Sequence, residues 1–354
     1  MRSLHAAAAF LLLGLATGAM ADPTTTISGK AFVDYSYRDN VDKGTDTKDK
    51  ASGASLDLKR FYLGVDHTFD PVWAARFRTD VGNEVNGKYD VFVKHAYVQA
   101  TIDPALVIRA GAADLPWVPF VEDLYGYRYV ENVMVDRSKY ESSADWGVHA
   151  LGKLGGGVVN YAVSVYNGRG YGDPTRTKAP AVAARLGLVP VEGLTLAVGG
   201  TATKLGQNVE GTATPNTATR YDAIIAWVSG PLRAGVTGFY ATDYDKGMVL
   251  GTTPLDKAIG ASGWASFAFT PMWAVFGRVD YVQPRKDTNS GLKDTYMNAG
   301  LQLTPAKPLN LSLVYKYETA ENGTVSTSNG TIGSTVAGSK GVYNEVGLWA
   351  QYSF

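Results

Sequence analysis

Residues 309–318 read LNLSLVYKYE, and this stretch decides the fold. Its apolar side chains stand at every second position, from Leu309 to Tyr317, and the positions between them include Asn310, Lys316 and Glu318. A period of two places consecutive side chains on opposite faces of a β-strand. About ten residues is also the length that a tilted strand needs to cross a bilayer. The stretch therefore predicts a strand with one apolar and one polar face, long enough to span a membrane.

The same alternation recurs along most of the chain after residue 22. Residues 27–37, 72–81 and 272–282 each divide into an apolar and a polar face in this way. Two stretches are less regular. At 90–101 either face could be the apolar one, and at 55–69 the alternation slips around Lys59 and Arg60. One extra residue in a strand, a β-bulge, would explain such a slip.

The connections between these strands alternate between two kinds. The short ones are rich in Pro and Gly, which suit tight turns at strand ends: Asp70-Pro71, Asp103-Pro104, Gly155–Gly157, Val191–Gly193, Gly230-Pro231, Thr270-Pro271 and Pro305–Pro308. The long ones are polar: 39–54, 83–89, 114–143, 168–179, 205–218, 243–257, 284–293 and 321–341. Seven turns and eight loops join sixteen strands. Short periplasmic turns and long external loops are typical of outer-membrane barrels, and both termini would then lie in the periplasm.

The aromatic residues support this prediction. On the apolar face, Phe69, Trp73, Phe269, Trp273 and Phe354 stand near short turns, whereas Tyr37, Tyr221, Tyr240, Tyr281 and Tyr317 stand near long loops. Two such girdles mark the membrane boundaries of a barrel. A soluble β-sandwich, the alternative, needs only about seven to nine strands and does not sort its loops by length. We predict an all-β fold, a transmembrane antiparallel barrel of sixteen strands over residues 22–354.

The N-terminus predicts secretion. Arg2 precedes the apolar run 6–20, and Ala19 and Ala21 fit a cleavage site before Asp22, so we expect residues 1–21 to be a cleaved signal peptide. Without Arg2, 32 Lys and Arg face 33 Asp and Glu, and this near-neutral balance predicts no nucleic-acid partner. Cysteine is absent, so disulfides do not stabilise the chain.

The C-terminal strand, GVYNEVGLWAQYSF at 341–354, ends in an alternating apolar series that includes Tyr352 and Phe354. A terminal Phe after such a series resembles the signal by which barrels reach the outer-membrane assembly machinery. Residues 56–82 and 94–120 resemble the opening strands of the phosphate-selective porin O/P family. The resemblance covers roughly 27–170 and implies a sixteen-stranded trimeric diffusion channel of the Gram-negative outer membrane, in contact with its lipid and lipopolysaccharide. It also implies a third long loop that folds into the pore.

The polar faces predict the charges of the pore wall. Their basic residues are Lys30, Arg38, Arg60, Arg76, Arg78, Arg109, Lys153, Arg185, Arg220, Arg233, Arg278 and Lys316. Their acidic residues are Asp34, Asp66, Asp80, Asp145, Asp222, Asp280, Glu318 and Glu345. The basic excess of about four predicts a mild preference for anions in a channel for small hydrophilic solutes. A channel specific for phosphate, sugars or carboxylates is the alternative.

The loop 114–143 carries the opposite charge, with six acidic residues and three basic ones. If it folds inward, acids such as Glu122 and Asp123 would face wall arginines, for which Arg76, Arg78 and Arg109 are our candidates. Salt bridges within the wall are the alternative for these arginines. Further candidates for the constriction are Trp117, Phe120, Tyr125 and Arg128. The loop's aromatic residues would either contact a solute or pack the loop against the wall, and the second interpretation is slightly favoured.

A barrel enzyme is the main alternative class. It needs a nucleophile and a base held together, and the mature chain has only His67, His95 and His149. His149 falls on the polar face with no obvious nucleophile beside it in the sequence pattern. Calcium-loop and nucleotide-binding motifs are also absent from the sequence, so we predict no enzyme, no metal and no cofactor.

Overall fold

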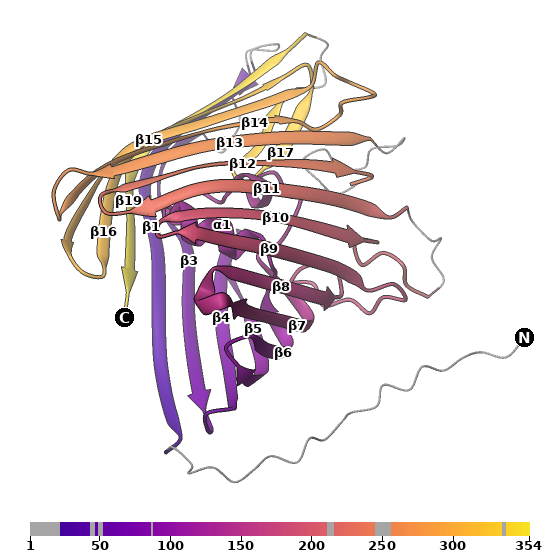
Figure 1. Ribbon diagram of the computed structural model, residues 1–354. Helices are drawn as coiled ribbons and strands as arrows, with labels where there is room; N and C mark the ends of the chain where they lie inside the picture. The colour runs from indigo at the N-terminus through magenta and orange to yellow at the C-terminus, as the bar shows by residue number, and fades with distance from the viewer. Residues whose placement is uncertain are drawn as a thin grey trace, which may run out of the picture.

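The computed structural model describes residues 22–42, 47–48, 52–85, 88–210, 216–244, 256–334 and 338–354. The expected signal peptide, residues 1–21, lies outside this set. Within the described residues the chain forms one closed antiparallel β-barrel (Figure 1). The predicted fold class is therefore confirmed.

Sixteen of the described strands close the barrel, and the two-residue strand β2 (Thr47–Lys48) pairs with β1 outside this count. Each barrel strand pairs with its neighbours in the chain, and the last pairs with the first, Lys30 opposite Ser353 and Asp42 opposite Gly341. Their bounds are β1 Thr24–Asp42, β3 Gly53–Thr68, β4 Trp73–Val85, β5 Lys88–Asp103, β6 Leu106–Asp114, β7 Ala144–Leu154, β8 Val159–Tyr166, β9 Ala181–Val191, β10 Leu194–Thr203, β11 Ala218–Ser229, β12 Leu232–Thr242, β13 Lys257–Ala268, β14 Trp273–Gln283, β15 Lys293–Ala306, β16 Leu309–Glu321 and β19 Lys340–Ser353.

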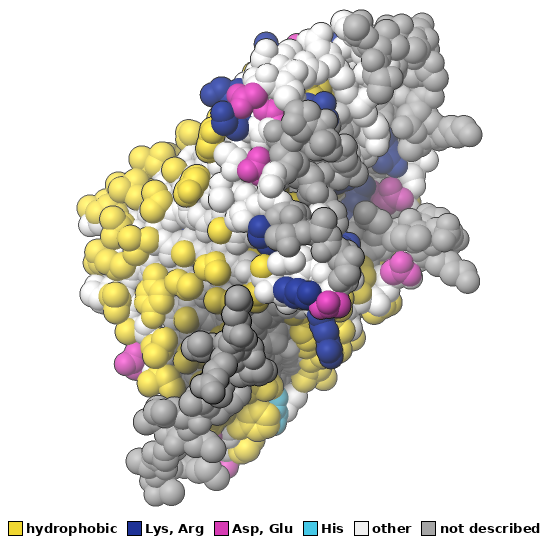
Figure 2. All heavy atoms as spheres, turned by 90° about the vertical axis from the view of Figure 1, so that its right-hand side faces the viewer, with side chains coloured by type: hydrophobic (Ala, Val, Ile, Leu, Met, Phe, Trp, Pro, Cys, Tyr) yellow, Lys and Arg dark blue, Asp and Glu magenta, His cyan; other side chains and the backbone are white. Residues whose placement is uncertain are grey.

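The alternation of side chains assigns the two faces as the sequence predicts. Apolar side chains of the strands point outward: Leu313 is 55% exposed and Ile27 is 64% exposed. Figure 2 faces the loop end of the barrel and shows apolar side chains gathered on the outer wall, with most charged ones near the loops. Polar residues of the same strands, such as Asp34 and Lys316, are buried inside. The barrel thus has an apolar outside and a charged interior.

Short turns occur where we predict them, at 69–72, 104–105, 155–158, 192–193, 230–231, 269–272 and 307–308. The prediction of a long loop at 83–89 is wrong. The ladder continues through the pairs Glu84 opposite Tyr89 and Val85 opposite Lys88, so only 86–87 separate β4 from β5. Polar residues suit a strand end in water as well as they suit a loop, and the sequence pattern therefore placed this boundary too early.

Both irregular stretches contain a break in register. In β3, Arg60 faces Phe32 whereas Leu58 faces Val33, so Lys59 is the extra residue of a bulge. In β5, His95 faces Arg78 whereas Val93 faces Thr79, so Lys94 is the extra residue of a second bulge. The bulge predicted at 59–60 is confirmed. The second bulge explains why neither face of 90–101 is consistently apolar.

Within the part of the chain that the structure describes, two long connections contain helices or a hairpin of their own. Between β6 and β7 lie the helices α1 (Val118–Tyr125) and α2 (Met134–Arg137), and between β16 and β19 lies a hairpin of β17 (Thr324–Thr327) and β18 (Gly330–Gly333). The turn Gly155–Gly157 is a short 3₁₀ segment. Among the described residues, neither α-helix is long and apolar enough to cross a membrane.

Candidate functional site

The segment 115–143, called the inner loop below, lies inside the barrel. Its helix α1 packs against β12. There the guanidinium of Arg233 donates to the carbonyl oxygens of Asp123 (2.6 Å) and Leu124 (2.7 Å) near the C-terminal end of α1. Cationic groups are favourable at this end of a helix, because its last carbonyls have no partner within the helix.

Aromatic residues fasten the inner loop to the barrel wall. Trp117 and Tyr125 are each only 2% exposed. The Tyr125 ring lies 5.9 Å from that of Trp264, and Tyr127 stacks on Phe276 at 4.1 Å. The packing interpretation is therefore favoured over contact with a solute. Phe120 is half-buried, with the Arg185 guanidinium 3.8 Å above its ring.

Arg137 of α2 makes the largest set of ion pairs between loop and wall. Its guanidinium contacts Asp280 (3.0 Å), Asp294 (2.6 Å) and Glu318 (2.5 Å), and all four side chains are fully buried. These acids come from β14, β15 and β16. Arg137 supplies positive charge to all three carboxylates, and Asp280 also pairs with Arg278, which together offset part of the cost of burying the acids.

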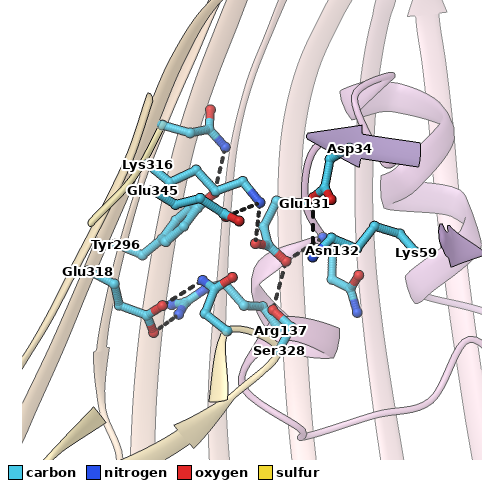
Figure 3. Close-up of polar contacts among 12 residues, drawn as sticks. Asp34, Lys59, Glu131, Asn132, Arg137, Tyr296, Lys316, Glu318, Ser328 and Glu345 are labelled. Carbon is cyan, nitrogen blue, oxygen red and sulfur yellow. Dashed lines mark hydrogen bonds and ion pairs between the residues drawn. The ribbon is translucent and has the colours of Figure 1, made fainter. Parts of the chain in front are cut away.

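A second cluster lies beside it, as Figure 3 shows. Lys316 of β16 stands between Glu131 of the loop (3.4 Å) and Glu345 of β19 (3.2 Å). The β17–β18 hairpin joins this cluster, since the Ser328 hydroxyl donates to Glu131 (2.7 Å) and its backbone nitrogen donates to the Arg137 carbonyl (3.0 Å). The hairpin therefore holds the second half of the inner loop in place.

Some cations that we predict for the open pore wall hold the loop instead. Arg278 is 2% exposed, pairs with Asp280 (2.5 Å) and donates to the Asn132 carbonyl (2.6 Å). Arg185 donates to the carbonyl of Pro116 (2.8 Å). Both side chains point inward as predicted, but neither is a free charge of the pore. The alternation in the sequence predicts which face of a strand a side chain lies on. It does not predict whether another segment packs over that side chain.

Among the residues that the structure describes, one cavity lies on each side of the inner loop. An inner cavity of ≈ 470 Å³ lies toward the short turns and is lined by Gly29 and Ser353 among others. Its charged lining comprises Lys30, Arg78, Lys94, Arg128, Asp114, Glu122 and Asp123. An outer cavity of ≈ 350 Å³ lies toward the long loops and is lined by Asp136, Lys139, Glu141 and Arg220.

The partition between the two cavities comes from loop and wall together. On the loop side, Arg128 of the inner cavity pairs with Glu122 (2.6 Å) and lies 4.0 Å from Asp136 of the outer one. On the wall side, Asp80 accepts hydrogen bonds from Arg60 (3.3 Å) and from the hydroxyl of Tyr171 (3.3 Å). We regard this region as the candidate constriction.

Most of the remaining residues that we predict for the pore wall lie near the short turns or bond to another side chain of the wall. Arg76 and Arg109 each stand three residues from a short turn, Arg76 bonded to Asp66 and Arg109 to Gln99 (2.8 Å). Lys153, next to the turn 155–158, is exposed. Of the three arginines proposed to face the loop, only Arg78 lines the inner cavity with Glu122 and Asp123.

The histidines have partners within the wall. His149 Nδ1 lies 2.8 Å from the Ser164 hydroxyl, so the expectation that it lacks a nucleophile beside it is wrong. Ser164 is on β8, and its distance of 15 residues along the chain hides the pairing from the sequence. Each of the two residues is 2% exposed, which leaves a substrate no access. His95 Nε2 bonds to Asp114 (2.8 Å).

Two carboxyl groups of the inner loop titrate near neutral pH. Burial and the nearby Glu122 raise the pKa of Asp136 to about 6, against the opposing effect of Arg128. Burial and the nearby Asp222 raise the pKa of Glu141 to about 7, although Arg220 lies 2.8 Å away. A buried carboxyl group loses the hydration that favours its charged form. The charge at the constriction therefore changes between pH 5 and 8.

Sequence reasoning missed Lys94, Tyr171 and the β17–β18 hairpin as parts of the pore. Lys94 points inward only because of the bulge, for which the irregular alternation at 90–101 was the one signal. Asn329-Gly330 between alternating residues is a hairpin signal that the sequence does carry. The sequence around Tyr171 carries no signal that this residue enters the barrel, because residues distant in the chain hold it there.

Several solved structures have a fold similar to that of this chain. The outer-membrane channel DcaP of Acinetobacter baumannii superposes with a TM-score of 0.62, at 15% identity, over 97% of this chain and 100% of that one. The anion-selective porin from Comamonas acidovorans superposes with a TM-score of 0.65, at 13% identity, over 94% of this chain and 100% of that one. The protein has a porin fold. OmpT, an outer membrane protein of Vibrio cholerae, is a further match, with a TM-score of 0.63 at 14% identity over 95% and 100%. No protein-family profile matches the sequence, and no curated protein matches it either.

Proposed function

We propose that this protein is an outer-membrane channel through which small hydrophilic solutes and ions diffuse passively. The observation that carries the proposal is the inner loop, which narrows the lumen of a closed barrel but leaves cavities of ≈ 350 and ≈ 470 Å³ on its two sides. A barrel filled by side chains would serve as a structural element, whereas sixteen strands enclose an aqueous channel. The porin fold and the apolar outer wall support a place in the outer membrane of a Gram-negative bacterium.

The channel prefers anions in this proposal. The cations Arg137 and Lys316, which join the loop to the wall, each contact more than one carboxylate and so add no net positive field. Lys30, Arg78 and Lys94 of the inner cavity have no ion pair among the residues that the structure describes. In a water-filled lumen each unpaired charge is worth about 1 kcal/mol to an ion at 4 Å, which makes the preference mild.

The His149–Ser164 pair carries no catalysis in this proposal, because both side chains are buried in the wall. We also propose that the protein assembles as a homotrimer. A crystallised form of OmpT from Vibrio cholerae, whose fold is similar, is described as a trimer form. The apolar side chains of the outer wall would contact neighbouring chains and lipid.

Single-channel recording in planar bilayers tests the proposal. The purified protein should insert with discrete steps of conductance, and its reversal potential across a potassium chloride gradient should have the sign of chloride selectivity. A bilayer that stays silent after insertion of folded protein rules out the channel. A potential with the sign of potassium selectivity leaves the channel standing but contradicts the anion preference.

A matched pair of variants locates the selectivity. Arg78→Gln removes a charge from the inner cavity, and Lys153→Gln removes one from the exposed short-turn end. We expect the reversal potential to shift toward cation selectivity in the first variant and to change little in the second. Equal shifts would mean that the whole wall sets selectivity, and not the constriction.

A further inference from the structure

The cations inside the barrel differ in their partners. Arg185 and Arg233 donate to backbone carbonyl groups of the inner loop. Carboxylates contact four others, which are Arg137, Arg220, Arg278 and Lys316. In the inner cavity, Lys30, Arg78 and Lys94 have no such partner among the described residues. Lys94 is buried, whereas Arg78 is half-buried and Lys30 is exposed. Buried charges are usually paired, because removing a charge from water is costly. The buried ammonium of Lys94, which has no carboxylate partner among the described residues and shares its cavity with two further cations, therefore needs an explanation.

Lys94 is the most exceptional of the three. Its residue is 9% exposed, yet none of the carboxylates that the structure describes lies within ion-pair distance of its ammonium group. Instead Nζ stands 4.7 Å from the ring centre of Tyr62 and 5.5 Å from that of Tyr171. Aromatic faces stabilise a cation without neutralising it. The ammonium thus keeps its full charge and its three N–H donors while it borders the inner cavity.

The second residue with which Lys94 interacts, Tyr171, comes from the long connection between β8 and β9. The carboxylate of Asp145 accepts hydrogen bonds from the backbone nitrogens of Gly168 (2.9 Å) and Gly170 (2.8 Å), which draws this connection into the barrel. Tyr171 then contacts Asp80 through its hydroxyl and Phe92 through its ring, at 5.7 Å. Its chain neighbours Gly170 and Asp173 line the outer cavity, so we infer that Tyr171 stands beside Lys94 on that side.

The charge of the inner cavity limits what it can hold. Four cations, Lys30, Arg78, Lys94 and Arg128, and three carboxylates, Asp114, Glu122 and Asp123, line it, which leaves one net positive charge if His95 is neutral. A single negative charge would balance it. Doubly ionised phosphate, HPO4²⁻, would exceed it. The planar fork of Arg78 matches a carboxylate in two hydrogen bonds.

We propose that Lys94, Arg78 and Lys30 form a binding site for a small monocarboxylate, with Tyr171 as its cover toward the outer cavity. The site rests on the proposed channel function and adds a solute class to it. A solute carboxylate receives hydrogen bonds from the Lys94 ammonium and the Arg78 guanidinium, and its small organic group lies against the Tyr62 ring. Occupancy of the site makes the current carried by such an anion saturate.

The test is the dependence of single-channel conductance on salt concentration, in sodium acetate and in sodium chloride. In the unmodified protein the acetate conductance should saturate at concentrations where the chloride conductance still rises. In Lys94→Gln the half-saturating acetate concentration should rise about tenfold or more. Lys94→Arg keeps the charge and should restore most of the saturation. Lys153→Gln, at the exposed end of β7, should behave as the unmodified protein does.

Tyr171→Ala and Tyr171→Phe test the cover. The alanine variant should conduct more and saturate less sharply, whereas the phenylalanine variant keeps the ring and should differ little in saturation. Unheated gel mobility shows for each variant that the barrel has folded.

Three results would overturn the site and leave the channel intact. These are a linear acetate conductance in the unmodified protein, unchanged saturation in Lys94→Gln, and saturation by sodium phosphate at lower concentration than by acetate. A folded protein that conducts in none of these salts would instead contradict the proposed function itself.

Discussion

Buried charged residues determine how the inner loop lies in the barrel. Arg137 reaches three carboxylates from three different strands. Lys316 joins the loop to β19 through Glu131 and Glu345 (Figure 3). Each of these partners would be costly to bury alone. Arg137 and Lys316, which hold the loop, therefore differ from Lys94 of the inner cavity in that carboxylates contact them.

Replacement of Arg137 should release the loop. Arg137→Met leaves Asp280, Asp294 and Glu318 buried with one guanidinium fewer, a change that typically costs about 3–5 kcal/mol. We expect a lower temperature for the shift from folded to unfolded gel mobility, and faster cleavage within 115–143 by added protease. Lys139→Met is the matched control, since the Lys139 side chain bonds only the Ser326 hydroxyl among the described residues (2.6 Å). If both variants unfold at the same temperature as the unmodified protein, the ion pairs do not hold the loop.

Asp136 should make ion selectivity depend on pH. Its pKa is raised to about 6 by burial and by Glu122, so the carboxyl group is largely ionised at pH 7.5 and largely protonated at pH 5. Acidification removes a negative charge beside Arg128 and leaves the constriction more positive. The chloride preference, measured as the reversal potential, should rise from pH 7.5 to pH 5.

Asp136→Asn isolates this effect. The variant should show at pH 7.5 the stronger chloride preference that the unmodified protein reaches at pH 5, with little further change on acidification. Glu192→Gln, at an exposed short turn, should keep the full pH response. A response that persists in Asp136→Asn would place the titrating group elsewhere, with Glu141 the next candidate because its pKa is about 7.

Strands and loops differ in how far the sequence predicts them. Strands such as β14 and β16 could be predicted because contact with lipid on one side and water on the other imposes alternation at every residue. The loops and the ends of the strands both face water, so polar residues do not show where a strand ends and a loop begins. The loop predicted at 83–89 is mostly strand for this reason. The helix α1 and the inward course of Gly168–Tyr171 depend on Arg233 and Asp145, which are distant in the chain.

The C-terminal strand offers a test at the level of an element. Phe354 closes the barrel through two backbone hydrogen bonds with Gly29, each 3.0 Å, and its ring remains 56% exposed. Phe354→Ala keeps both backbone bonds, so refolding of the purified chain in detergent should be nearly normal. If the ring is an assembly signal, the amount of barrel in the outer membrane should fall severalfold.

Leu348→Ala is the control for this test, because Leu348 lies on the same outer face of β19 and is also 56% exposed. It should reduce the membrane level only slightly. Equal failure of Phe354→Ala in detergent and in cells would show that the ring stabilises the barrel itself. The same comparison with Tyr352→Ala would show how far the signal extends along the strand.

Closure within a single chain determines where the pore lies in any oligomer. Hydrogen bonds join β1 to β19, so each chain completes its own barrel (Figure 1). Each chain therefore encloses its own cavities. The outer wall is apolar along the strands, and such a surface can contact lipid or a second copy without burying charge. Oligomer formation therefore should change the number of pores per particle and not the properties of each pore.

A homotrimer should accordingly conduct as three equal and independent channels. Under high voltage we expect each inserted particle to close in three steps of the same size, and cross-linked, unheated protein to migrate as a trimer. Dissociated monomers that keep their folded mobility should conduct in single steps of that same size and with the same reversal potential. One indivisible step that appears only in the assembled particle would place the conducting path between the chains, where the charged residues of the barrel interior could not act on it.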